Sequence, residues 1–282
     1  MKKVAVIQDL SSFGKCSLTA AIPVLSVMGV QACPLPTAIL SAQTEYSSFF
    51  CEDLTANMPF FINEWQNSHE HFDGIHTGFI TGKAQIVHIL NFLDIFHNAN
   101  TTVLVDPVMG DRGTAYTNFD EELLAYMKIL VKRADIVTPN LTECCLLNGL
   151  SYQSLERYVE EKDFLKKVEE AGMQLAQETG AQVIITGISP PSKSPSAQSI
   201  GNMYIGSSSA VYSSIPYNGK SYSGTGDLFA SIMMGSLMRG DSLTEAIELA
   251  EKFLTVSIED TALEGSSTVA GVNFEKFLRL LL

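Results

Sequence analysis

Short apolar runs alternate with longer helical patterns along most of the chain. Four runs are typical of buried strands: Val4–Ile7, Thr102–Val105, Asp135–Val137 and Val183–Ile185. Segments with helical spacing of apolar residues lie between and after them, at 18–28, 83–96, 121–131, 143–147, 163–178, 228–238 and 243–261. Strands that alternate with helices usually form a mostly parallel sheet covered by helices on both faces. The pattern therefore predicts an α/β fold of this kind.

Polar residues follow each of the four strand-like runs. They are Gln8-Asp9, Asp106-Pro107, Thr138-Pro139-Asn140 and Thr186-Gly187. Ligands of open α/β sheets bind outside the carboxyl ends of the strands. The four clusters therefore predict a ligand site along one edge of the sheet. Two later runs, 203–205 and 210–215, indicate a hairpin with its tip at 206–209.

Length and charge narrow the classes of function. The 282 residues contain no repeat or linker, and we expect one domain over 1–282. The formal net charge is −13 and the pI is about 4.8, which disfavours nucleic acid and anionic membranes as partners. We therefore expect small-molecule ligands.

The cysteines and the first residues indicate a reduced compartment. The five cysteines are odd in number and form no Cys-x-x-Cys pair, which argues against a disulfide framework or a structural zinc site. The start, Met1–Ile7, lacks the long apolar region of a signal peptide, and no stretch is long enough to span a bilayer. We expect a cytoplasmic protein.

The segment Ser223-Gly224-Thr225-Gly226-Asp227 precedes an apolar run with helical character, 228–234. Its two glycines allow a tight turn, and the following helix would direct free N–H groups at the turn. An anion is the natural occupant of such a site. Asp227 then has two interpretations. In the first, it removes a proton from a hydroxyl that attacks the anion, as in a small-molecule kinase. In the second, it is an ordinary residue of the first helical turn, where the helix dipole favours a negative charge.

Two further segments carry carboxylates just after a strand. Asp106-Pro107-Val108-Met109-Gly110-Asp111 contains two, which could hold Mg²⁺ beside phosphates or serve only to form a turn. In Thr138-Pro139-Asn140-Leu141-Thr142-Glu143, Asn140 and Glu143 have the spacing of a capping box. The same two residues could also lie near a metal and phosphates, and the spacing does not separate these interpretations.

Two familiar phosphate-binding patterns are excluded. Gly14-Lys15-Cys16-Ser17 lacks both the upstream glycine of a phosphate loop and a Ser or Thr directly after the lysine. No G-x-G-x-x-G follows the first strand, which disfavours a Rossmann dehydrogenase.

Taken together, Asp106–Asp111, Thr138–Asn140 with Glu143, and Gly224–Asp227 resemble the ribokinase-like superfamily, which has a three-layer fold. The chain is most similar to its pyridoxal/pyridoxamine (vitamin B6) kinase branch, which also fits Val6-Ile7-Gln8 and Gln43-Thr44-Glu45-Tyr46. The resemblance covers nearly the whole chain. It implies ATP-dependent phosphorylation of the 5′-hydroxymethyl group of pyridoxal, pyridoxamine or pyridoxine, in a homodimer that uses Mg²⁺. Dependence on a monovalent cation such as K⁺ is left open.

The resemblance also implies roles for single residues. Asp227 would be the catalytic base and contact the substrate, with Gly224, Thr225 and Gly226 forming the anion hole. Asp106 and Glu143 would hold Mg²⁺ near the nucleotide phosphates. The other residues implied in ATP binding are Asp111, beside a short lid, Thr138, Asn140 and Thr186, while Thr44 would line the pyridine pocket.

The chain differs from the B6 kinases at two positions that concern substrate binding. B6 kinases of this kind usually have Ser where this chain has Asp9, and some relatives have Tyr where it has Phe79. Asp9 could pair with a ring nitrogen, amine or hydroxyl of the substrate, or simply form a turn. Hydroxymethylpyrimidine kinase of thiamine synthesis therefore stays open as an alternative, followed by a sugar or nucleoside kinase. A non-catalytic B6 or nucleotide sensor represents a different class.

Overall fold

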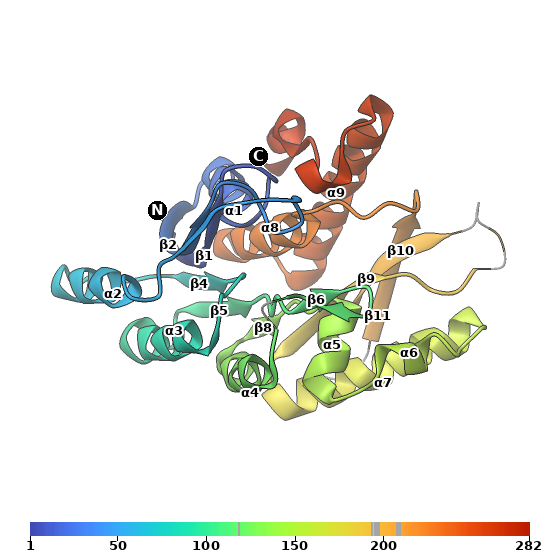
Figure 1. Ribbon diagram of the computed structural model, residues 1–282, viewed down its shortest axis with the longest axis horizontal. Helices are drawn as coiled ribbons and strands as arrows, with labels where there is room; N and C mark the ends of the chain where they lie inside the picture. Colours follow the sequence, from blue (N-terminus) through green and yellow to red (C-terminus); the bar gives the residue numbers. More distant parts are fainter. Residues whose placement is uncertain (118, 193, 195–197, 207–209) are drawn as a thin grey trace. The chain divides into compact units, whose positions relative to one another are not determined.

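The computed structural model describes residues 1–117, 119–192, 194, 198–206 and 210–282 (Figure 1). The chain forms two compact units. The first consists of Met1–Leu104 and Ser221–Leu282, and the second of Val105–Lys220. The single domain expected over 1–282 stays a prediction.

The strands of the first unit follow the order β5-β4-β1-β2-β3. Their bounds are β1 Lys3–Ser11, β2 Gln31–Leu40, β3 Cys51–Asp53, β4 Gly74–Thr77 and β5 Thr102–Val105, whose last residue begins the second unit. β1 pairs in parallel with both β2 and β4, and the edge strand β3 is antiparallel to β2. Val4–Ile7 of β1 are fully buried, as expected for a parallel strand covered on both faces.

Helices lie on both sides of these strands, as Figure 1 shows. One side carries α1 (Ser17–Val27), α8 (Thr225–Arg239) and α9 (Leu243–Glu264), and the other α2 (Met58–Asn67) and α3 (Lys83–Phe96). Two 3₁₀ segments, Thr268–Ala270 and Phe274–Leu281, end the chain. A Cβ at Gly74 of β4 would lie 2.7 Å from the sulfur of Met234, so this glycine lets α8 pack closely on the sheet.

The second unit continues the α/β pattern and ends in antiparallel strands. Its strands are β8 Ile136–Val137, β9 Gln182–Ile188, β10 Ser199–Ile205 and β11 Ala210–Pro216, in that order in the sheet. β8 and β9 are parallel, and β10 is antiparallel to both β9 and β11. A separate small hairpin joins β6 (Gly110–Asp111) to β7 (Thr114–Ala115). The helices are α4 Glu121–Leu130, α5 Leu141–Asn148, α6 Tyr152–Leu155 and α7 Glu161–Thr179, with a 3₁₀ turn at Val131–Arg133.

Local signals account for several of these boundaries. α4 begins after Asp120, whose side chain accepts a hydrogen bond from the Leu123 N–H at 2.6 Å. α9 begins with a capping box between Ser242 and Glu245. Because such contacts join residues three positions apart, they are visible in the sequence.

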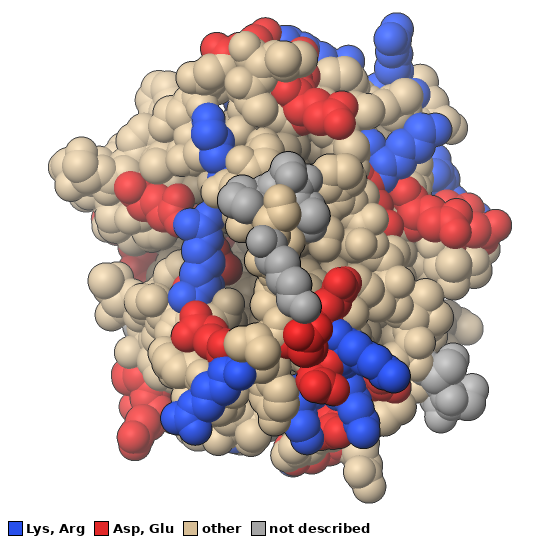
Figure 2. Space-filling model, turned by 90° about the vertical axis from the view of Figure 1, so that its right-hand side faces the viewer, with Lys and Arg blue, Asp and Glu red and all other residues tan. Residues whose placement is uncertain are grey.

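The predicted α/β fold with a mostly parallel sheet is confirmed. The hairpin of 203–205 and 210–215 is also confirmed as β10 and β11, while residues 207–209 of its tip lie outside the described residues. Helix α2 was not predicted from the sequence. Within the described part of the chain, no helix combines the length and apolar character needed to cross a bilayer. On the face drawn in Figure 2, Lys and Arg side chains lie among Asp and Glu side chains.

Candidate active site

The first unit brings together the residues predicted for catalysis and substrate binding. Three of them lie at the carboxyl ends of neighbouring parallel strands. Asp9 lies near the end of β1, at a register shift against β2 between Gln8 and Leu10. Thr44 follows β2 and is exposed, and Phe79 follows β4 and is partly buried. The register shift at Asp9 is a β-bulge, and a β-bulge can redirect a side chain next to a ligand site.

The helix α8 begins at the Gly-Thr-Gly-Asp segment. Gly224 has the left-handed φ of 79° that the turn requires, and the first intrahelical bond runs from the Leu228 N–H to the Gly224 carbonyl at 3.0 Å. The N–H groups of residues 225–227 therefore have no partner within the helix. A Cβ at Gly226 would meet no described atom within 4 Å, which leaves space over the first turn for a ligand. This geometry suits a bound anion.

Asp227 occupies the first turn of α8 and is partly buried. Burial raises the pKa of Asp227 to about 7; a hydrogen bond from the Ser17 backbone N–H opposes this rise, and the nearby Asp9 carboxylate adds to it. A carboxylate whose pKa lies near neutrality is well matched to accept a proton at physiological pH. The side chain thus has the proton affinity that a general base needs.

The loop before α1 packs tightly against this turn. A Cβ at Gly224 would lie only 2.2 Å from the carbonyl oxygen of Lys15. Lys15 and Ser17 both have left-handed backbones, with φ of 51° and 47°. Non-glycine residues in this region store strain, which is common at ligand sites. The Lys15 ammonium donates to Asn273 and Glu275 at 3.1 and 3.0 Å.

Gln43 connects three segments around the same turn. Its amide nitrogen donates to the Ser223 hydroxyl and to the Val269 carbonyl, both at 3.1 Å. Its carbonyl accepts from the Glu45 N–H at 2.8 Å, and Glu45 in turn accepts from the Ser223 hydroxyl at 2.6 Å. The exposed Thr44 is therefore held between two anchored residues. The sequence pointed to Thr44 but not to this role of Gln43.

A second polar contact that the sequence did not reveal lies deeper in the sheet. Gln8 and His76 are fully buried on β1 and β4, with their side-chain nitrogens 3.0 Å apart. Burial lowers the pKa of His76 to about 3, so its ring is neutral. Neighbouring Gly78 accommodates Gln8, because a Cβ there would lie 2.9 Å from the Gln8 side chain.

The second unit brings together the residues predicted for ATP and metal binding. The capping box at the start of α5 is confirmed: Asn140 accepts from the Glu143 N–H at 3.0 Å, and Glu143 accepts from the Asn140 N–H at 2.8 Å. The Asn140 amide also donates to the Gly110 carbonyl at 2.7 Å, which connects α5 to the β6–β7 hairpin. Asn140 forms a β-bridge with Thr186. Thr186 and Gly187 were predicted to follow the strand, but β9 extends to Ile188, so Thr186 lies inside it.

Glu143 lies near other carboxylates, although no three His, Cys, Asp or Glu side chains of the described residues come together as the ligands of a metal ion would. The buried Glu143 also accepts from the Met109 N–H at 3.1 Å. Burial raises the pKa of Glu143, and the nearby Asp106 carboxylate raises it further. The hydrogen bonds from the Asn140 and Met109 N–H groups lower it, and Asp111 adds a smaller increase. A divalent cation would relieve this repulsion, so Asp106 and Glu143 fit Mg²⁺, with water or phosphate supplying the remaining oxygens.

Thr138 completes this group. Its N–H donates to the Val105 carbonyl at 3.1 Å, which places it beside Asp106 at the end of the strands. Its buried hydroxyl has no hydrogen-bond partner within the described residues. A buried hydroxyl normally finds a partner, so a ligand or water atom is expected here.

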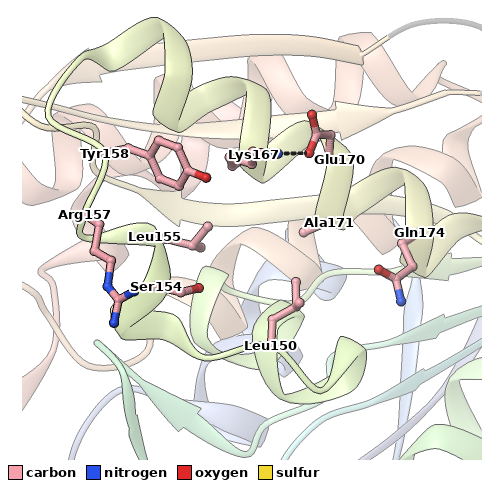
Figure 3. Close-up of a pocket in the computed structure, with 9 residues that line it drawn as sticks. All are labelled: Leu150, Ser154, Leu155, Arg157, Tyr158, Lys167, Glu170, Ala171 and Gln174. Atoms are coloured by element: carbon pink, nitrogen blue, oxygen red, sulfur yellow. Dashed lines mark hydrogen bonds and ion pairs between the residues drawn. The ribbon is translucent and has the colours of Figure 1, made fainter.

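The residues predicted for catalysis and substrate binding and those predicted for ATP and metal binding belong to different units. Every residue predicted for catalysis or substrate binding falls in the first unit, and every residue predicted for ATP or metal binding falls in the second. A further hollow of about 390 Å³ in the second unit, lined mainly by α6, α7 and the loop between them, contains none of these residues (Figure 3). An ion pair between Lys167 and Glu170 forms part of its wall.

Comparison with known proteins decides the family. The sequence profile of the phosphomethylpyrimidine kinase family matches residues 12–272. The chain belongs to this family. It is a kinase of the ribokinase-like group that includes pyridoxal kinases and phosphomethylpyrimidine kinases, and the resemblance inferred from its motifs is confirmed.

The chain is similar both to pyridoxal kinases and to phosphomethylpyrimidine kinases. A solved protein from Bacteroides thetaiotaomicron, provisionally named a phosphomethylpyrimidine kinase and crystallised with pyridoxal, shares 38% identity and a TM-score of 0.89 over 99% of this chain and 95% of that chain. The structure of a pyridoxal kinase from Lactobacillus plantarum is 28% identical, with a TM-score of 0.86. The match covers 100% of this chain and 97% of that chain. A hydroxymethylpyrimidine/phosphomethylpyrimidine kinase from Bacillus subtilis is 29% identical over 265 residues, 93% of this chain and 84% of that protein.

Replacing Glu143 with Ala tests the metal assignment in this family member. We expect a higher Mg²⁺ requirement in a turnover assay, and a loss of about 1–3 kcal/mol of unfolding free energy because two backbone N–H groups lose their acceptor. Glu245→Ala is the matched control, since Glu245 occupies the same capping-box position in α9. An unchanged Mg²⁺ titration in Glu143→Ala would leave this residue only its structural role.

Proposed function

We propose that this kinase transfers the γ-phosphoryl group of ATP to the 5′-hydroxymethyl group of pyridoxal or a related B6 vitamer. The observation that carries the proposal is the start of α8, where Asp227, with a pKa of about 7, lies beside free backbone N–H groups and open space. The presence of pyridoxal in the Bacteroides relative supports this choice of substrate.

In the proposed mechanism Asp227 accepts the proton of the substrate hydroxyl as the hydroxyl oxygen attacks the γ-phosphorus of ATP. The bond between the γ-phosphorus and the oxygen that bridges it to the β-phosphorus breaks, and ADP leaves. The turn of Gly224, Thr225 and Gly226, with the N–H groups of residues 225–227 that have no partner within the helix, would stabilise the negative charge that develops on the transferring group. Phosphoryl transfer depends mainly on positioning and charge neutralisation, so these two contributions suffice for the acceptor side.

On the donor side we assign nucleotide binding to the cluster in the second unit. The unpartnered hydroxyl of Thr138 and the side chains of Asn140 and Thr186 would contact ATP, with Asp111 beside the short hairpin. Mg²⁺ held by Asp106 and Glu143 would neutralise phosphate charge. A monovalent cation, a homodimer and a cytoplasmic location remain predictions.

Hydroxymethylpyrimidine is the second candidate acceptor. It is favoured by the family profile and by the Bacillus subtilis relative, and it presents the same reacting group on a similar ring. The two departures from B6 kinases, Asp9 and Phe79, both lie in the first unit, with the other residues that we assign to the acceptor. The choice of ring is therefore a question for experiment.

A substrate panel tests the proposal. Purified protein with ATP and Mg²⁺ would be supplied with pyridoxal, pyridoxamine, pyridoxine or hydroxymethylpyrimidine, and phosphorylated product would be quantified. We expect the highest kcat/KM with a B6 vitamer. A higher value with hydroxymethylpyrimidine would establish the second candidate, and binding of pyridoxal without any product would indicate a sensor.

A further inference from the structure

Ser223, the residue just before the Gly-Thr-Gly-Asp turn, makes three hydrogen bonds to other segments. Its hydroxyl donates to the Glu45 carboxylate at 2.6 Å and accepts from the Gln43 amide nitrogen at 3.1 Å. Its backbone N–H donates to the Thr268 carbonyl at 3.1 Å. These partners belong to the loop after β2 and to the 3₁₀ segment that follows α9, both far from Ser223 in the sequence. The backbone that leads into the turn is therefore held from two directions.

Gln43 is itself anchored. The residue is 7% exposed, and its amide nitrogen donates a second hydrogen bond to the Val269 carbonyl at 3.1 Å. Its carbonyl accepts from the Glu45 N–H at 2.8 Å, so the two residues that hold Ser223 also hold one another. A Cβ at Gly14 would lie 2.3 Å from the Gln43 side chain, which shows how closely the loop before α1 encloses it. A buried polar network whose members are all bonded is rigid.

We propose that Gln43 and Glu45 are positioning residues for the anion hole, acting through Ser223. This inference rests on the proposed role of the turn in phosphoryl transfer. Ser223 directly precedes Gly224, whose left-handed φ of 79° sets the direction of the free N–H groups that follow. Donors that are oriented before the reaction stabilise developing charge at no cost of reorganisation. The hydrogen bonds to Ser223 keep these donors in place.

The loop after β2 thereby serves two parts of the proposed site. Thr44, the residue assigned to the acceptor ring, lies between Gln43 and Glu45 and is exposed, whereas both its neighbours are bonded to Ser223. One set of hydrogen bonds therefore connects the residue that would contact the ring with the turn that would contact the phosphoryl group. Fixing two reacting groups against the same framework is an effective way to place them for reaction.

The test compares Ser223→Ala with Ser242→Ala. Ser242 is the matched control, because its hydroxyl also lies at the start of a helix, donates to the Glu245 carboxylate at 2.7 Å and accepts from the Glu245 N–H at 3.3 Å. Both variants should lose a similar amount of stability in chemical denaturation. Only Ser223→Ala should lose kcat, roughly 10-fold with little change in the KM for ATP, because misdirected donors fail chiefly when charge develops in the transition state.

Two substitutions of Glu45 separate the hydrogen bond from the charge. Glu45→Ala removes the acceptor of the Ser223 hydroxyl and should lower kcat in the same direction as Ser223→Ala. Glu45→Gln retains an acceptor oxygen, so it should recover most of the kcat that Glu45→Ala loses. An equal loss in both variants would overturn the role given to Glu45.

Backbone ¹⁵N order parameters of residues 225–227 provide a readout that does not depend on turnover. They should fall in Ser223→Ala and keep their wild-type values in Ser242→Ala. Such a fall would support the proposal even if no substrate of the panel is phosphorylated, in which case only the proposed function fails.

An unchanged kcat in an active Ser223→Ala protein would overturn the proposal, as would an equal loss of kcat in Ser242→Ala. Where no substrate is turned over, unchanged order parameters in Ser223→Ala would overturn it. If Ser223→Ala does not fold, Glu45→Ala takes its place in both measurements, because Glu45 is exposed.

Discussion

Asp227→Asn is expected to lower kcat by about 10²–10⁴-fold, the usual contribution of a general base. Asparagine has nearly the same shape but cannot accept the substrate proton. Because the wild-type carboxylate is partly buried and its pKa is raised to about 7, replacing it with a neutral side chain should leave the folded state at least as stable. Turnover with the best acceptor of the panel and thermal unfolding are the two measurements.

The pH dependence of the wild type follows from the same carboxylate. Only the ionised form of Asp227 accepts a proton, so kcat/KM should be highest above pH 7 and fall as the pH decreases through about 7. Asp241→Asn, just beyond the other end of α8, is the matched control and should keep both the rate and the profile. Near-normal turnover of a folded Asp227→Asn protein would show that another group accepts the proton.

Gly224→Ala should destabilise the first unit and impair turnover. The left-handed φ of 79° costs an L residue about 1–2 kcal/mol. The added Cβ would also lie 2.2 Å from the Lys15 carbonyl oxygen, a backbone atom that can withdraw only if the loop moves. Overpacking of this kind adds about 1–3 kcal/mol. Chemical denaturation would measure the loss, and kcat should fall because the displaced loop packs against the turn that leads into Asp227.

Gly240→Ala separates the two contributions to the expected loss of stability, the left-handed backbone and the contact with Lys15. Gly240 has a comparable φ of 92°, but a Cβ there would meet no described atom within 4 Å. It should therefore cost only the backbone contribution of about 1–2 kcal/mol and leave kcat unchanged. Equal destabilisation by the two substitutions would mean that the Lys15 contact does not constrain the loop.

Much of the fold and part of the site follow from the order of residues. The alternation of apolar runs and helical patterns determined the α/β class, because burial of a strand or a helix face requires a characteristic period. The capping box of Asn140 and Glu143 was also predictable, since its partners are three residues apart. The turn and helix start at Gly224–Asp227 could be read for the same reason, because the glycine that makes the turn directly precedes the first turn of the helix.

Only the tertiary structure decided how these pieces influence one another. Gln43 holds Ser223, and Gln8 contacts His76. No local spacing encodes these pairs, because they form when distant strands and helices pack. The raised pKa of Asp227 also depends on the tertiary structure. The sequence shows that residue 227 is an aspartate, but the burial and the neighbouring charge that raise its pKa exist only in the folded chain.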